Sequence, residues 1–419
     1  MEWKQVCDRG IINGGNLYRF GKVFTRAENG ERLKIGFLGG SITQGALAKT
    51  PQGCYAYLVY RWWQEHFPDA QFEYINAGIG ATSSQFGAAR VQSDLLRYKP
   101  DVIFLEFSVN DADSEFFRET FEGTVRRILT AESKPALFMF NNVHYNDGSS
   151  AQRVHNEIGK AYGLPIISIR ESIYEELAAG RLPAPDITPD NLHPNDRGHR
   201  MVADVICNLL DRIRAACSGT AACQKCGNNG AADEAASGTC KGEDAVICDL
   251  LTGNGYFPLP GGKRVPFEQT PYIMPEQPLT ANRFEHYRRY QNLDLPGAKI
   301  HGFTADHRPQ DGVADVFKNG WSVMEEGSSF EAVVEASCIS VQFRRTVSKP
   351  APVARAVVDG DEENAVVLDA NFDLTWGDFC CLTDIAEGLP YGEHRLRITI
   401  VQKPEQPAND FYLISILCA

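Results

Sequence analysis

Several features that define large functional classes are missing from this sequence. The glycine-rich segment 36–45 lacks both the Gly-x-Gly-x-x-Gly spacing of dinucleotide-binding proteins and the Gly-Lys-Ser/Thr end of a phosphate-binding loop. It also fails to form the Gly-x-Ser-x-Gly elbow of α/β-hydrolases, because Thr43 occupies the position of the second glycine. These absences exclude nucleotide binding of either kind at this segment, and they exclude an α/β-hydrolase elbow.

Basic residues and long apolar segments are also scarce. Lys and Arg number 41 against 54 Asp and Glu, which gives a net charge of -13. Because no basic excess is present to release counterions, we expect neither nucleic acid nor an anionic membrane as a partner. The first ten residues contain no apolar stretch typical of a secretory signal or a spanning helix, which predicts a cytoplasmic protein.

The 12 cysteines fit a reducing compartment, where thiols stay unpaired. Cys223 and Cys226 have the spacing of a zinc knuckle, but no second Cys-x-x-Cys follows them. We therefore favour a connector rich in small residues over a metal site, and we predict no metal. This connector, residues 216–244, contains or adjoins five of the cysteines: Cys217, Cys223, Cys226, Cys240 and Cys248.

The connector separates two regions with different hydrophobic patterns. Before it, apolar runs alternate with helical patterns, which predicts an α/β domain over residues 1–215 with an N-terminal extension at 1–30. After it, residues 245–419 have short alternating segments and frequent turn residues, which predicts an antiparallel β-sandwich. In the first region we expect five parallel strands near 33–39, 72–77, 102–107, 136–141 and 165–169, and helices near 54–67, 84–98, 116–130, 149–162 and 196–215.

A serine directly follows the first of these strands. Ser41 stands after the two glycines that end the strand, and Asp190 and His193 occur together much further along the chain. A serine hydroxyl needs a neighbouring base to take its proton and a third group to orient that base. Ser41, His193 and Asp190 can fill these three roles. The alternative is that Ser41 only caps the helix that follows.

Two further strand ends offer donors for an oxyanion hole. The strand at 72–77 runs into a loop of small residues, and the strand at 102–107 is followed by Asn110. A purely structural interpretation of each is open, since glycines make turns and an Asn-Asp pair closes a strand. His144 and His155 are weaker candidates for the base because neither has an Asp-x-x-His context, and we attribute Asp111 to solvation of the strand end.

Taken together, four segments resemble the sequence blocks of the SGNH (GDSL-type) hydrolases in order and in position at strand ends. They are Gly39-Gly40-Ser41-Ile42-Thr43, Asn76-Ala77-Gly78-Ile79-Gly80, Ser108-Val109-Asn110-Asp111 and Asp190-x-x-His193-Pro194. The resemblance implies a three-layer α/β/α, flavodoxin-like domain with Ser41 as nucleophile, His193 as base and Asp190 as its orienter. It also implies an oxyanion hole made of the Ser41 amide, the Asn110 side chain and the amide of Gly80 or Ala81.

Two positions depart from the pattern of that family. Gly40 stands where an aspartate usually precedes the serine, and Ala81 aligns with the slot of the donor glycine. A backbone N–H can still donate from alanine if its φ and ψ allow. Which of the amides of Gly80 and Ala81 points inward stays open at this point.

A β-sandwich behind an SGNH domain resembles the two-domain carbohydrate O-acetylesterases of carbohydrate esterase family 17. Their second domain is similar to a family 35 carbohydrate-binding module, which implies a jelly-roll sandwich here. Sugars stack on aromatic rings, so some aromatic side chains of this region are candidate platforms, although a place in the sandwich core is the alternative for each. These candidates are Tyr287, Tyr290, Trp321 and Trp376.

The resemblance implies a serine esterase that removes acetyl groups from plant-derived oligosaccharides, above all acetylated β-mannan. It implies no cofactor, and an acetylated oligosaccharide is the expected partner. Three alternatives remain: an acetyl-xylan esterase, a lipid or acyl-thioester esterase on the same triad, and a sugar-binding protein without activity. The sequence leaves the oligomeric state open.

Overall fold

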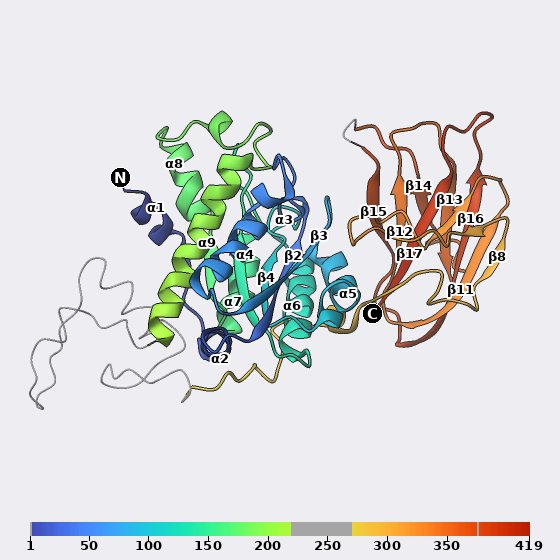
Figure 1. Ribbon diagram of the computed structural model, residues 1–419. Helices are drawn as coiled ribbons and strands as arrows, with labels where there is room; N and C mark the ends of the chain where they lie inside the picture. Colours follow the sequence, from blue (N-terminus) through green and yellow to red (C-terminus); the bar gives the residue numbers. More distant parts are fainter. Residues whose placement is uncertain (1, 219–269, 375–376) are drawn as a thin grey trace, which may run out of the picture. The chain divides into compact units, whose positions relative to one another are not determined.

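The computed structural model describes residues 2–218, 270–374 and 377–419 and separates them into two compact units (Figure 1). The first unit comprises Met1–Ser84 and Val91–Asn282, and the second comprises Gln85–Arg90 and Arg283–Ala419. Most of the predicted linker, with Cys223, Cys226, Cys240 and Cys248, lies outside the described residues. Among the helices that are described, none combines the length and the apolar character needed to cross a membrane.

The first unit is built on a mixed sheet of six strands in the order β1-β6-β5-β4-β2-β3. Five of them run parallel, in the order typical of flavodoxin-like folds, which confirms the predicted fold class. The sixth, β1, pairs antiparallel with β6 and was not predicted, because residues 1–30 were expected to form only an extension. The strands are β1 (Ile11–Asn13), β2 (Arg32–Gly39), β3 (Gln71–Gly78), β4 (Val102–Glu106), β5 (Ala136–Asn141) and β6 (Ile166–Ser168).

Helices cover both faces of this sheet because its strands are apolar on both sides (Figure 1). In β4, Phe104 joins one hydrophobic cluster, whereas its neighbours Ile103 and Leu105 join the cluster on the opposite face. The first cluster includes α1 (Trp3–Arg9), α2 (Tyr18–Glu28), α4 (Tyr55–His66) and α9 (Asp196–Cys217). The second includes α5 (Ser84–Asp94), α6 (Glu115–Thr130) and α7 (Gln152–Ala161).

Residues 270–282 belong to the first unit, although the sequence placed them in the β-rich domain. The buried carboxylate of Glu122 on α6 accepts hydrogen bonds from the backbone N–H groups of Leu279 and Thr280, at 2.6 and 2.8 Å. The Tyr272 hydroxyl donates to the backbone oxygen of Tyr162 at 2.9 Å. These contacts are made by single polar groups far apart in sequence, so no local pattern could have revealed them.

The second unit contains two antiparallel sheets whose apolar faces share one core, which confirms the predicted sandwich. One sheet has the order β15-β12-β17-β10-β9, with β7 also paired to β17, and the other has the order β14-β13-β16-β11-β8. Along β11, buried and more exposed residues alternate, as expected for a strand with one face in a core. The strands are β7 (Arg288–Tyr290), β8 (Lys299–His301), β9 (Thr304–Ala305), β10 (Trp321–Val323), β11 (Ser329–Ala336), β12 (Ile339–Arg345), β13 (Val353–Val358), β14 (Val366–Asp369), β15 (Phe379–Ala386), β16 (Gly392–Gln402) and β17 (Phe411–Cys418).

Candidate active site

The three residues of the predicted triad meet at the carboxyl edge of the parallel sheet. Ser41 begins the short helix α3 (Ser41–Gln44) just after β2, and its Oγ lies 2.8 Å from Nε2 of His193. The other ring nitrogen of His193, Nδ1, lies 2.7 Å from Oδ2 of Asp190. In this strand order, β2 and β4 flank the switch point at which open α/β sheets bind ligands. The arrangement is that of a nucleophile, a base and an orienting carboxylate.

The loop that holds His193 is fixed by its own side chains. Oδ1 of Asp190 accepts the backbone N–H groups of Leu192 and His193, at 3.0 and 2.7 Å. Partial burial alone would raise the pKa of Asp190, but these bonds and the bond from the His193 ring outweigh it and lower the pKa. Asp190 is therefore a carboxylate at neutral pH, able to hold Nδ1–H and leave Nε2 facing the serine. Just beyond this loop, Asn195 caps helix α9.

Glycine, and not the aspartate usual in the family, stands at position 40 for a steric reason. A Cβ added at Gly40 would lie 2.3 Å from Oδ1 of Asn110, which is closer than any real contact. Neighbouring Gly39 is equally confined, since its Cβ would lie 2.2 Å from Oγ1 of Thr43. Glycine at position 40 therefore lets the Asn110 amide approach the turn that presents Ser41.

The structure distinguishes between the two candidate amides of the second block. The N–H of Gly80 donates to Oε1 of Gln44 at 2.7 Å, so it is already engaged. Ala81 has a φ of 55°, in the left-handed region that favours glycine, and within the described part of the chain no acceptor engages its N–H. Ala81, rather than Gly80, is the donor that this geometry supports. Gln44 was missed in the sequence because nothing local marks its long-range partner.

Two of the four proposed aromatic platforms are wrong. The side chain of Tyr287 is 0% exposed and that of Trp321 is 2% exposed, so neither can stack on a sugar. Trp321 instead packs edge-on against Phe330 in the core of the sandwich, with the ring centroids 4.8 Å apart. Tyr290 is half-buried and packs beside the same core. Trp376 lies outside the described residues.

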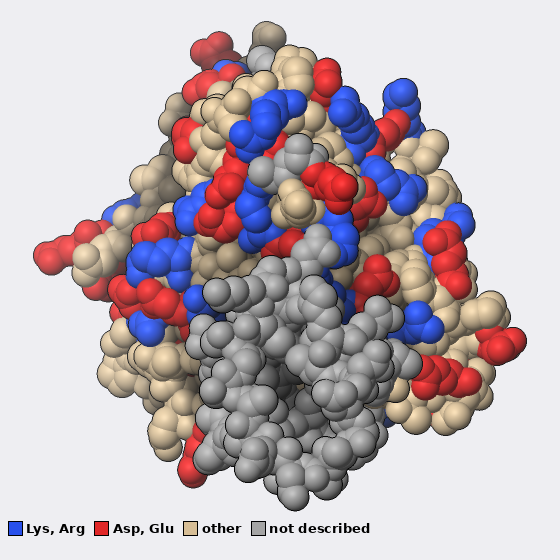
Figure 2. Space-filling view, turned by 90° about the vertical axis from the view of Figure 1, so that its left-hand side faces the viewer, with Lys and Arg blue, Asp and Glu red and all other residues tan. Residues whose placement is uncertain are grey.

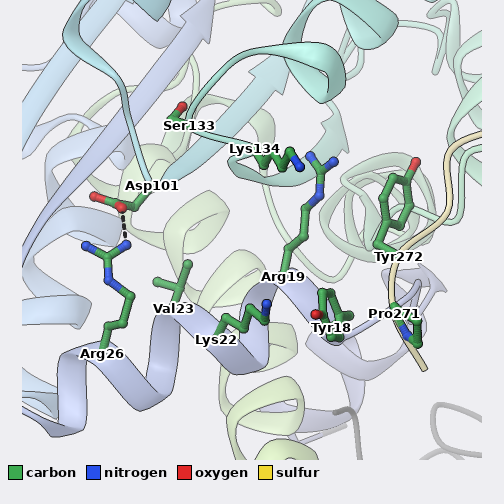
Figure 3. Close-up of a pocket in the computed structure, with 10 residues that line it drawn as sticks. All are labelled: Tyr18, Arg19, Lys22, Val23, Arg26, Asp101, Ser133, Lys134, Pro271 and Tyr272. Atoms are coloured by element: carbon green, nitrogen blue, oxygen red, sulfur yellow. Dashed lines mark hydrogen bonds and ion pairs between the residues drawn. The ribbon is translucent and has the colours of Figure 1, made fainter. Parts of the chain in front are cut away.

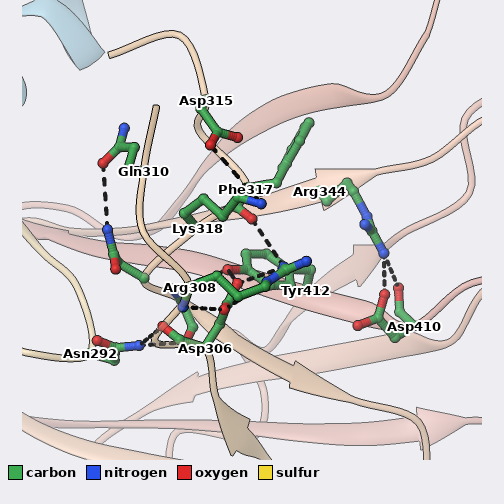
Figure 4. Close-up of polar contacts among 12 residues, drawn as sticks. Asn292, Asp306, Arg308, Gln310, Asp315, Phe317, Lys318, Arg344, Asp410 and Tyr412 are labelled. Atoms are coloured by element: carbon green, nitrogen blue, oxygen red, sulfur yellow. Dashed lines mark hydrogen bonds and ion pairs between the residues drawn. The ribbon is translucent and has the colours of Figure 1, made fainter. Parts of the chain in front are cut away.

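Polar residues of the second unit form a paired cluster around the loop at 306–320 (Figure 4). Arg308 donates to Asp306 through its backbone N–H and its guanidinium at 2.7–2.9 Å, and the Tyr412 hydroxyl donates to the same carboxylate at 2.7 Å. The bonds from Arg308 lower the pKa of Asp306, with the Tyr412 bond adding to the effect. The charges of Asp306 and Arg308 are paired with each other. Such a pair stabilises the loop, whereas an acid–base site needs a group that can exchange a proton.

A cavity of about 500 Å³ lies toward the opposite edge of the parallel sheet (Figure 3). Asp101 and Lys134, which help to line it, come just before β4 and β5. Its lining includes no histidine or cysteine, and two of its cations are bound within the protein. Arg19 donates to two backbone carbonyls at 3.0 Å, and Arg26 pairs with Asp101. This cavity therefore has no counterpart of the His193–Asp190 pair beside Ser41.

Charged side chains of both signs are interspersed over the face shown in Figure 2. Figure 2 shows no large region of one sign among the described residues of that face. Among its described residues, this face therefore offers no large basic region on which a polyanion would gather.

Comparison with known proteins agrees with the geometry of the site. Residues 37–201 match the model of the GDSL-like Lipase/Acylhydrolase family. The chain is 43% identical to a two-domain esterase (CEX) active on acetylated mannans, whose crystal structure with mannopentaose aligns with 98% of this chain and 97% of that chain at a TM-score of 0.84. Another crystal structure of that esterase gives a TM-score of 0.83 at the same identity, covering 98% of each chain.

A more distant relative is Thioesterase 1/protease 1/lysophospholipase L1 of Escherichia coli (strain K12). It is 25% identical over 220 residues, which cover 48% of this chain and 98% of that protein. The chain belongs to the GDSL/SGNH hydrolase family. It is a two-domain carboxylic ester hydrolase of the serine type.

Proposed function

We propose that the protein removes acetyl groups from acetylated β-mannan oligosaccharides. The observation that carries this proposal is the 2.8 Å contact between Ser41 Oγ and His193 Nε2 in a chain similar over both units to an esterase active on acetylated mannans. That esterase was crystallised with mannopentaose, which supports an oligosaccharide as the ligand here.

In the proposed reaction, each residue has one part. Ser41 Oγ attacks the acetyl carbonyl carbon and its proton passes to Nε2 of His193, while Asp190 holds the ring through Nδ1. The negative charge on the carbonyl oxygen is stabilised by the N–H groups of Ser41 and Ala81 and by the side-chain amide of Asn110. His193 then gives its proton to the departing sugar oxygen.

The second half of the reaction releases acetate. A water molecule loses a proton to His193 and attacks the acetyl group on Ser41, and His193 returns that proton to the serine oxygen as the bond breaks. Both halves use the same donors for the same developing charge. None of these steps calls for chemistry beyond that of the side chains and water.

The test uses acetylated mannan oligosaccharides and mass spectrometry. We expect the protein to remove acetyl groups from these oligosaccharides, and we expect Ser41→Ala to lose this activity by about a millionfold in kcat, as for other serine triads. Ser41→Ala should keep its fold, since the change removes only one oxygen. Undiminished deacetylation by Ser41→Ala would contradict the mechanism.

A substrate panel separates the proposed function from the alternatives. We expect acetyl esters of mannan to be hydrolysed faster than acetylated xylan, long-chain acyl esters or acyl thioesters. A preference for long-chain esters or thioesters would favour the activity in the name of the Escherichia coli relative. Binding of mannan without any release of acetate would favour a sugar-binding protein.

We also propose a role for the second unit and a location for the protein. The similarity of both units to the mannopentaose-bound esterase supports a carbohydrate-binding role for the β-rich unit. Free thiols support a reducing compartment, the cytoplasm. Among the described residues, these thiols include Cys7, Cys54, Cys207, Cys338, Cys380, Cys381 and Cys418. Recovery of the protein outside the cytoplasm in a cell fractionation would contradict this location.

A further inference from the structure

We propose that Asp111 is a positioning residue that braces two segments of the oxyanion hole, the one with the Ala81 amide and the one with the Asn110 side chain. This inference rests on the esterase mechanism and not on the choice of mannan as substrate. Asp111 follows Asn110 directly, in the loop after β4. The sequence suggested that it is a solvated carboxylate at a strand end, but its side chain is 0% exposed.

The Asp111 carboxylate joins two segments that are distant in sequence. Its Oδ1 accepts the backbone N–H of Ser84 at 2.8 Å, at the start of α5 and three residues after Ala81. The backbone N–H groups of Asn110 and Asp111 both donate to the oxygen of Phe107, at 3.0 and 2.9 Å. One carboxylate therefore fixes the distance between the loop that bears the Ala81 amide and the loop that bears the Asn110 side chain.

The second oxygen of Asp111 is tied to a helix behind the site. Its Oδ2 lies 3.0 Å from Nε2 of His155 on α7, whose side chain is 1% exposed. The His155 ring stacks on Phe121, with the centroids 3.7 Å apart. The start of the same helix holds the Asn110 loop a second time, since Ala151 N–H donates to the oxygen of Ser108 at 2.7 Å.

The hydrogen-bond partners of His155 agree with a structural brace and not with a second acid–base pair. Its Nδ1 is buried, and no group in the described residues pairs with it. Nε2 is the ring nitrogen that faces Asp111, so Nε2–H donates to that carboxylate. His155, which the sequence offered as an alternative base, is thereby excluded from that role by burial and by its partner.

Bracing of this kind has a catalytic consequence because an oxyanion hole works through donors already aimed at the developing charge. Removing one donor of such a hole costs about 100-fold to 1000-fold in kcat. Loss of the Asp111 carboxylate would displace the Ala81 and Asn110 donors but would not remove them. We therefore expect Asp111→Ala to lower kcat by about 10-fold to 100-fold and to change KM for a small acetyl ester little.

The matched control is Asp101, at the other end of β4. Asp101 is also a carboxylate bonded to a backbone N–H, that of Lys34 at 2.7 Å, and to a partner side chain, Arg26. It lines the cavity of Figure 3, away from Ser41. Asp101→Ala should lower the thermal unfolding midpoint, as Asp111→Ala does, but leave kcat unchanged.

The decisive measurement compares kcat for 4-nitrophenyl acetate with the inhibition constant of methylboronic acid. Ser41 Oγ adds to the boron of this inhibitor, its proton passes to His193, and the resulting tetrahedral anion places an oxygen in the hole. If Asp111 positions the donors, Asp111→Ala weakens boronate inhibition by the same factor by which it lowers kcat/KM. A purely structural role moves only the unfolding midpoint.

Two further variants keep the proposal falsifiable if Asp111→Ala fails to fold. Asp111→Asn retains an acceptor for Ser84 N–H, so its kcat should lie closer to the wild-type value. In the background of Asn110→Ala, the change Asp111→Asn should cost less in kcat than it does alone, because part of its effect passes through Asn110. Wild-type kcat and boronate inhibition in a folded Asp111 variant, or fully additive losses with Asn110→Ala, would overturn the proposal.

Discussion

In the α/β unit, the carboxylate of Asp190 holds a histidine that faces a serine, whereas in the β-rich unit the carboxylate of Asp306 holds a loop. Asp190 and Asp306 each accept several hydrogen bonds, from backbone and side chains, and the pKa of each is lowered. The difference lies in the partner. The imidazole of His193 has a second nitrogen that can exchange a proton with Ser41, but the guanidinium of Arg308 stays protonated.

The candidate residues of the two units differ in the same way. In the α/β unit, the candidates Ser41, His193 and Asp190 meet in one place. The sandwich requires large apolar side chains to fill the space between its sheets, so Tyr287 and Trp321 serve its core. A residue type indicates function only where the fold does not already need it.

Within this comparison, the largest expected effect comes from replacing each of the two carboxylates in turn by alanine. We expect Asp190→Ala to lower kcat by about 10,000-fold, because His193 loses the partner that fixes its tautomer. Asp306→Ala should leave kcat for 4-nitrophenyl acetate unchanged and lower the free energy of unfolding by about 1–3 kcal/mol, through loss of the bonds to Arg308 and Tyr412. Steady-state kinetics and denaturant unfolding measure both quantities.

The difference in unfolding free energy between wild type and Asp306→Ala should depend on pH, because the pKa of Asp306 is lowered. A carboxyl whose folded pKa is depressed stabilises the protein above its unfolded pKa, and this stability is lost as the pH falls through the folded pKa. The difference in stability between wild type and Asp306→Ala should therefore be full at neutral pH and shrink in acid. A difference that stays constant down to strongly acidic pH would mean that the charge of Asp306 does not contribute.

A smaller effect is expected when the usual aspartate of the family is restored at position 40. Gly40→Asp should lower kcat by about 100-fold to 1000-fold, because its Cβ would displace the Asn110 amide from the oxyanion hole. Gly297→Asp in the second unit is the control, since a Cβ there meets nothing within 4 Å. Full activity in Gly40→Asp would show that the Asn110 side chain does not depend on this glycine.

The smallest expected effect concerns an aromatic of the sandwich. Tyr287→Phe removes a buried hydroxyl that donates to Ser340 and should cost about 1 kcal/mol of unfolding free energy. Because the ring is fully buried, KM for acetylated mannan oligosaccharides should not change. An increase in KM for Tyr287→Phe would indicate that Tyr287 contacts the sugar. It would contradict the assignment of this residue to the core.

Sequence patterns alone were sufficient for the five parallel strands of the α/β unit and for the helices between them. The predicted helix at 116–130 is α6 (Glu115–Thr130), and the predicted strand at 136–141 is β5 (Ala136–Asn141), because a capping serine and a continuous apolar run are local signals. The strand β1 was missed because three residues are too few to show a period. Residues 270–282 were misplaced because they are held by Glu122 and Tyr162, which belong to distant helices.

The sequence by itself determined which residue types stand at the ends of which strands, and thus that Ser41, Asp190, His193 and Asn110 are candidates for one site. Only the tertiary structure decided that Gln44 engages the Gly80 amide, whereas no acceptor among the described residues engages the Ala81 amide. It alone decided that Asp111 is buried between Ser84 and His155. The physical reason is that the periodicity of apolar residues is a property of the local chain, whereas burial and the choice of a hydrogen-bond partner depend on groups that only folding brings together.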